Sequence, residues 1–213
     1  MARPAAYVFG YGSLAAVAAA AARQAPARDG DPRGYVTELR GHERWWGVAM
    51  DNRQAIPGYK RYLDADGDAP PVFVCFLDLR PLADGPRSAP AVNGVCTPVS
   101  RRALAALDRR ERNYRRVDVS PLVGHAAATV WAYVGSDGGR ARAQAGRDAG
   151  SAVVAHEYCG LVERGFARLG PREMERYRAT TAPPGVPEVA LTREELPPAR
   201  RPGGLLRRGR SSG

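Results

Sequence analysis

The sequence lacks the long apolar run that a membrane span requires. A transmembrane helix needs about 20 consecutive, mostly apolar residues, and no apolar stretch in this 213-residue chain approaches that length. Hydrophobic residues make up 44% of the chain, which is enough for one domain with a substantial core. We therefore expect a soluble cytoplasmic protein that has no membrane partner.

Cysteine is scarce, and its spacing excludes the common metal motifs. The chain has three cysteines and three histidines, with no C-x-x-C pair and no spacing typical of zinc ligands. Cys75 and Cys96 lie in strand-like runs, and Cys159 is far from both in the sequence. Buried free thiols in a reducing compartment are the expected state, and we expect neither a metal nor a cofactor.

Lysine is almost absent, because Lys60 is the only lysine among 32 basic residues. The net charge of +10 raises the question of a nucleic-acid partner. The arginines are scattered, however, and do not alternate with aromatic side chains as in a base-stacking surface. The densest basic cluster, PPARRPGGLLRRGRSSG from Pro197, has the composition of a disordered segment. We predict a domain over residues 1–195, a disordered tail over 196–213 and no nucleic-acid partner; the oligomeric state stays open.

Strand-like segments come first in the chain and helical segments last, which predicts an α+β fold. Strands are expected at 5–12, at 35–50 in two pieces with bends at Gly41 and Gly47, and at 71–79, 91–99, 114–119 and 128–134. Helices are expected at 14–23, after an N-cap at Ser100, at 151–169 and at 171–177. Residues 51–68 are rich in turn formers.

The segment YVFGYGSLAAVAAAAARQ, residues 7–24, fits three different patterns. It is weakly similar to a signal peptide, but the GYGS sequence interrupts its most apolar part. Residues 10–15 also satisfy the dinucleotide pattern G-x-G-x-x-A between a strand and a helix, which would indicate an NAD(P)-dependent oxidoreductase. That fingerprint needs further βαβ units, and mostly strands and turns follow. The third alternative is a tight turn that binds an anion.

A second motif favours this third alternative. Residues 107–116, LDRRERNYRR, contain the pattern L-D-x-x-E-x-x-Y-x-R, in which Glu111 ends a helix and Tyr114 opens a strand. A strand that ends in the YGSL turn, followed later by this pattern, resembles the γ-glutamylcyclotransferase superfamily. The resemblance covers the two motifs and their order, and the rest of the chain agrees in outline.

The resemblance implies a fold, a site and a reaction. The fold would be a small mixed β-barrel flanked by helices. The YGSL turn (Tyr11, Gly12, Ser13 and Leu14) would bind the γ-glutamyl head group, and Glu111 would be the catalytic acid/base. Tyr114 would line the pocket. The substrate would be a γ-glutamyl amine or a γ-glutamyl amino acid, and the products 5-oxoproline and a free amine.

The residues are compatible with this chemistry. In cyclotransfer the substrate's own α-amine attacks its γ-carbonyl, so the reaction needs neither an enzyme nucleophile nor a metal, and the chain has no G-x-S-x-G elbow. One carboxylate can move the protons if its pKa is raised by burial, and we expect this of Glu111. Two alternatives stay open, namely a solvated Glu111 in an arginine-rich helix end and a catalytically silent binding module of the same fold.

Overall fold

The computed structural model describes residues 6–21, 34–82, 91–123 and 128–199. Within these ranges the chain forms five α-helices and three open sheets, so the fold is mixed α+β. The largest sheet has the order β2-β6-β1-β8-β7 and contains β1 (Ala6–Gly10), β2 (Tyr35–Leu39), β6 (Val92–Val99), β7 (Tyr114–Asp118) and β8 (Val130–Gly135). Every residue of the central strand β1 is buried, because β6 and β8 pair with it on either side.

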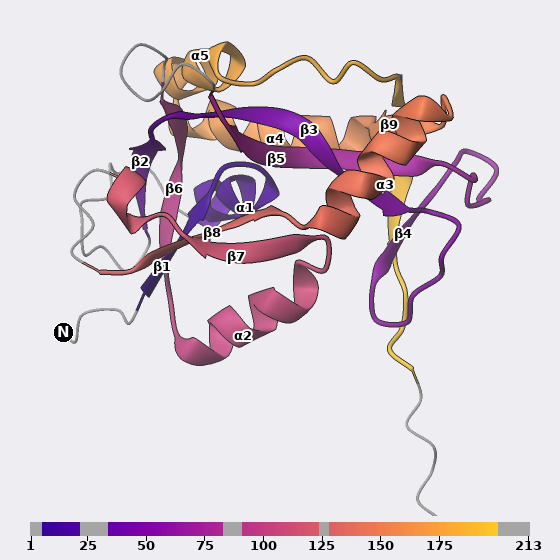
Figure 1. Ribbon diagram of the computed structural model, residues 1–213, viewed down its shortest axis with the longest axis horizontal. Helices are drawn as coiled ribbons and strands as arrows, with labels where there is room; N and C mark the ends of the chain where they lie inside the picture. Colours follow the sequence, from indigo (N-terminus) through magenta and orange to yellow (C-terminus); the bar gives the residue numbers. More distant parts are fainter. Residues whose placement is uncertain (1–5, 22–33, 83–90, 124–127, 200–213) are drawn as a thin grey trace, which may run out of the picture.

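A second sheet has the order β10-β9-β5-β3 and a third consists of β11 and β4. Their strands are β3 (His42–Asp51), β4 (Lys60–Leu63), β5 (Phe73–Pro81), β9 (Ala152–Ala155), β10 (Glu188–Val189) and β11 (Thr192–Glu195). The register of β3 against β5 shifts between Trp45 and Val48, which agrees with the bend expected at Gly47. Figure 1 shows the end of the described chain running alongside β4, away from the largest sheet.

The helices pack around these sheets. They are α1 (Ser13–Ala21), α2 (Arg101–Arg110), α3 (Asp137–Asp148), α4 (His156–Leu169) and α5 (Pro171–Ala179), with a short 3₁₀ turn at Ser120–Leu122. α1 packs against α4, and α3 packs against β3. Figure 1 shows α2 on the other side of the largest sheet from α4 and α5.

The predicted small β-barrel does not close within the residues that the structure describes. The edge strands β2 and β7 are not paired with each other. Besides its pairing with β6, the end of β2 makes an isolated antiparallel bridge between Leu39 and Val123 and a hydrogen bond from the Arg40 N–H to the Leu122 carbonyl. Leu122 and Val123 lie beyond the end of β7, so these contacts do not join the two edge strands and the sheet stays open.

Other sequence predictions are confirmed or corrected by the elements. Ser100 caps α2 by accepting a hydrogen bond from the Ala103 N–H at 3.2 Å. The helix predicted at 151–169 begins only at His156, because the β-branched run before it forms the buried strand β9. Helix α3 and strands β4, β10 and β11 were not predicted. In the predicted tail, the Leu196 N–H donates to the Tyr59 carbonyl and Pro197 accepts from the Gly58 N–H, and residues 200–213 lie outside the described ranges.

Candidate active site

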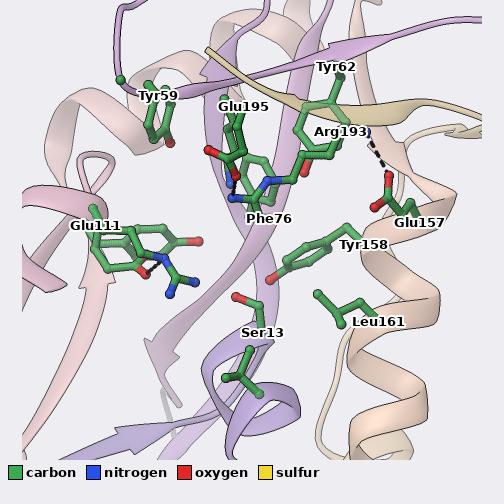
Figure 2. Close-up of a pocket in the computed structure, with 15 residues that line it drawn as sticks. Ser13, Tyr59, Tyr62, Phe76, Glu111, Glu157, Tyr158, Leu161, Arg193 and Glu195 are labelled. Carbon is green, nitrogen blue, oxygen red and sulfur yellow. Dashed lines mark hydrogen bonds and ion pairs between the residues drawn. The ribbon is translucent and has the colours of Figure 1, made fainter. Parts of the chain in front are cut away.

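A cavity of about 490 Å³ lies where β4 and β11 face α1, α4 and the end of α2. Figure 2 shows Glu111 and Ser13 on different sides of this cavity, with the Tyr158 side chain reaching from α4 into the space between them. The lining is mixed polar and aromatic, and includes Ser13, Val17, Gly58, Tyr59, Lys60, Tyr62, Phe76, Arg110, Glu111, Tyr114, Glu157, Tyr158, Leu161, Arg193 and Glu195.

A small hollow of about 30 Å³ adjoins the large cavity and shares several lining residues with it. All the residues to which the resemblance assigns a role line this hollow, namely Tyr11, Gly12, Ser13, Leu14, Glu111 and Tyr114. Leu77, Tyr133 and Tyr158 complete its walls. The fold therefore brings together two motifs that are about a hundred residues apart in the chain.

The turn from β1 into α1 lines the hollow with the first residues of a helix. The first hydrogen bond of the helix runs from the Ala16 N–H to the Gly12 carbonyl at 3.1 Å, so the N–H groups just before Ala16 have no partner within the helix. Gly12 leaves room here, because a Cβ at this position would be 3.2 Å from the Tyr158 hydroxyl oxygen. This arrangement is suited to a carboxylate.

Glu111 is the C-cap of α2, where its N–H donates to the Leu107 carbonyl. Its side chain is 15% exposed, and its Oε1 lies 3.4 Å from Nε of Arg110. Burial raises the pKa of Glu111 above its ordinary value of 4.5, and Arg110, Lys60 and Arg193 oppose this shift. The pKa of Glu111 thus moves in the direction that the sequence analysis expected of a carboxylate that acts as a base near neutral pH.

Two tyrosines fix the walls of the hollow through hydrogen bonds to the backbone. The Tyr11 hydroxyl donates to the Tyr133 carbonyl at 2.5 Å, and the Tyr114 hydroxyl donates to the Leu77 carbonyl at 2.9 Å. Burial raises the pKa of both phenols well above 10.0, so both are neutral. Since each proton is already donated to a carbonyl, the free lone pairs of each hydroxyl can only accept a hydrogen bond from a ligand.

Charged groups of both signs face the large cavity. Its cations are Lys60, Arg110 and Arg193, and its carboxylates are Glu111, Glu157 and Glu195. The Arg193 guanidinium forms an ion pair with Glu195, and the backbone N–H of Arg193 donates to Oε2 of Glu157 at 2.8 Å. Figure 2 shows both contacts, the ion pair within β11 and the hydrogen bond between β11 and α4.

Several lining residues were not found by sequence reasoning. Tyr59, Lys60, Phe76 and Tyr158 carry no motif and reach the cavity only through the packing of β4, β5 and α4. The one signal in the sequence was that Lys60 is the only lysine of the chain. Burial lowers the pKa of Lys60 to about 8 from an ordinary 10.5.

Other notable side chains do not line the cavity. Trp46 belongs to the core, because it is 4% exposed, and its indole N–H donates to the Ala182 carbonyl. Asp108 supports the end of α2, because it accepts from Arg116 at 2.7 Å and from the Tyr133 hydroxyl at 2.8 Å. Cys75 and Cys96 are buried free thiols, as predicted.

Among the described residues, no group of three or more His, Cys, Asp or Glu side chains is arranged to hold a metal ion. Over the same residues, no helix is both long and apolar enough to cross a membrane. Comparison with known proteins adds no assignment, because neither a protein-family model nor a curated protein matches the chain.

Proposed function

We propose that the protein is a γ-glutamylcyclotransferase-like enzyme that releases 5-oxoproline and a free amine from a γ-glutamyl amine or a γ-glutamyl amino acid. One observation carries the proposal: the YGSL turn, Glu111 and Tyr114 line a single hollow that opens beside a larger cavity. We also propose that the domain has a γ-glutamylcyclotransferase-like fold, because it contains the two motifs in this order.

The sizes of the two spaces suggest how the substrate is divided between them. A space of about 30 Å³ accepts only a few heavy atoms, since one water occupies roughly 10–15 Å³ on this measure. The α-carboxylate of the glutamyl group would enter it and accept hydrogen bonds from the N–H groups at the start of α1. The leaving amine would then extend into the cavity of about 490 Å³.

Glu111 then has a defined task. The α-ammonium of the substrate loses two protons when it becomes the lactam N–H, and the leaving nitrogen gains two when it becomes a free ammonium. Both nitrogens are bonded to the same carbon during the reaction, so one carboxylate can take a proton from the first nitrogen and return it to the second. The raised pKa of Glu111 makes it a stronger base than an exposed glutamate.

The dinucleotide alternative is not favoured by the topology. In a Rossmann unit, the strand after the first helix lies parallel and directly beside the first strand. Here β6 lies between β1 and β2 and is antiparallel to both, so β1 and β2 are not the adjacent parallel strands that a dinucleotide site requires. A titration with NAD(P) should accordingly give no binding.

The test is replacement of Glu111 by glutamine. We expect Glu111→Gln to lower 5-oxoproline release by about 10²–10⁴-fold while ligand binding and the melting temperature are kept. In the wild type, kcat/KM should rise with pH through a pKa above 4.5, because the carboxylate form takes up the proton. This acidic limb should disappear in the variant.

Glu175→Gln is the matched control, because Glu175 is an exposed glutamate of α5 that does not line the cavity. It should leave the rate unchanged. A Glu111→Gln variant with wild-type turnover would refute the role of Glu111. A wild type that binds γ-glutamyl compounds but releases no 5-oxoproline would instead indicate a binding module.

A further inference from the structure

Lys60 is the only lysine in a chain with 32 basic residues, and it lies in the wall of the large cavity. It is the first residue of β4, which pairs with β11. At every other basic position the chain uses arginine, including Arg110 and Arg193 in the same cavity. A purely electrostatic role at this position could have been filled by arginine.

The surroundings of Lys60 are aromatic on one side and charged on the other. Its Nζ lies 4.0 Å from the centre of the Phe76 ring on β5 and 5.7 Å from that of Tyr59. The charged groups that act on it come from β11 and from the end of α2; they are Arg193, Glu111, Arg110 and Glu195. Lys60 and Glu111 therefore both line the large cavity, and each affects the pKa of the other.

What distinguishes lysine from arginine here is its ability to release a proton. A guanidinium stays protonated under physiological conditions, whereas an ammonium can lose a proton when it is partly desolvated. Burial and the two arginines lower the pKa of Lys60 to about 8, while burial raises the pKa of Glu111. The two values approach each other, and this reduces the free-energy cost of moving a proton between the two groups.

We propose that Lys60, in place of Glu111, is the general acid that protonates the leaving amine, a role that rests on the proposed cyclotransferase function; Glu111 keeps the role of the base. The neutral α-amine, which has given one proton to solvent, forms a bond to the γ-carbonyl carbon and loses a second proton to Glu111. The bond from that carbon to the leaving nitrogen breaks as Lys60 Nζ donates a proton to this nitrogen. Transfer of a proton from Glu111 to Lys60 then restores both groups, and the released amine takes up its last proton from solvent.

The experiment compares two substrates whose leaving groups need different amounts of protonation. A γ-glutamyl alkylamide leaves as a strongly basic amine and depends on a general acid, whereas γ-glutamyl p-nitroanilide leaves as a weakly basic aryl amine. Lys60→Met and Lys60→Arg should both lower kcat for the alkylamide by about 10²–10⁴-fold and lower kcat for the anilide by less than about tenfold. Lys60→Arg keeps the charge, so the shared loss would reflect the missing proton transfer.

Arg61→Met is the matched control, because Arg61 is the next residue of β4, does not line the cavity and pairs with Glu194. It should leave both rates unchanged. In the wild type, the rate with the alkylamide should fall as pH rises through about 8, where Lys60 loses its proton. This alkaline limb should be absent with both Lys60 variants.

The outcomes separate this inference from the proposed function. Equal losses on the two substrates, or an unchanged alkaline limb in Lys60→Met, would overturn the role of Lys60 and leave the cyclotransferase proposal intact. A wild type that forms no 5-oxoproline from any γ-glutamyl compound would overturn both. Thermal unfolding of each variant shows whether a lost rate merely reflects a lost fold, and Lys60→Arg provides the second variant if Lys60→Met unfolds.

Discussion

Arg44 is fully buried, and all the acceptors of its hydrogen bonds are uncharged. Its Nε donates to the Tyr11 carbonyl at 2.7 Å, and one guanidinium NH₂ group donates to Oγ1 of Thr180 at 2.7 Å. The other NH₂ group donates to Oδ1 of Asn93 at 2.8 Å and also to the Asn93 carbonyl. Arg44 therefore ties β3 to the start of the YGSL turn and to the end of α5. Its charge is stabilised by the rings of two aromatic residues, whose centres lie 4.8 and 5.1 Å away.

Replacing Arg44 by methionine should destabilise the protein strongly. The variant would leave several buried acceptors without a donor, and each acceptor left unpaired costs about 1–3 kcal/mol. The measurement is the free energy of unfolding in urea. Arg53→Met, which removes an exposed ion pair with Asp51 at 2.8 Å, should cost less than about 1 kcal/mol. Equal small losses for the two variants would show that Arg44 does not hold the turn.

The close contact of α1 with α4 explains the alanine-rich sequence after the YGSL turn. Ala15, Ala16, Ala18 and Ala19 are all buried, and α1 packs on α4 at Gly165, where an added Cβ would be 2.4 Å from the Ala16 Cα. Only small side chains permit two helices to approach so closely. The alanine run therefore has a packing role, and it resembled a signal segment and a Rossmann helix only in composition.

Gly165→Ala tests this packing. The new methyl group must push the two helix backbones apart, which should cost about 1–3 kcal/mol. Because α1 begins at the YGSL turn, KM for a γ-glutamyl substrate should also rise. Gly160→Ala in the same helix meets only the flexible end of Arg164, and removing this helical glycine should raise stability by about 0.5–1 kcal/mol. Thermal unfolding and steady-state kinetics measure both effects, and a neutral Gly165→Ala would contradict the close contact.

Elements with a strong local signal could be predicted from the sequence, and elements that depend on partners could not. The apolar run of β5 and the Ser100 cap of α2 are local features, and both were predicted. The polar strands β4 and β11 exist because each supplies the other's hydrogen bonds, and neither has an apolar pattern of its own. The motif residues of the site were likewise local, whereas Lys60 and Tyr158 reach it only through the packing of separate elements.

At the scale of the whole molecule, the site depends on the end of the described chain. β11 pairs with β4 along Thr192–Glu195, and Arg193 and Glu195 face the cavity beside Lys60. The pairing continues beyond β11, because the Leu196 N–H donates to the Tyr59 carbonyl at 2.6 Å. This segment therefore forms one wall of the proposed active site.

A chain that ends at Val189 should therefore lose β11, the strand that buries Lys60 and places Arg193 beside it. Without β11 the ammonium gains solvent and loses Arg193, and both changes should raise the pKa of Lys60 from about 8 toward 10.5. The loss of Glu195 would lower the pKa of Lys60, but Glu195 affects this pKa less than burial or Arg193 does. Because the chain has one lysine, reductive methylation with ¹³C-formaldehyde gives a single side-chain NMR signal from which this pKa can be read. A chain that ends at Ala199 keeps β11 and should keep the lower value; a pKa of about 8 in the shorter chain would show that β11 does not create it.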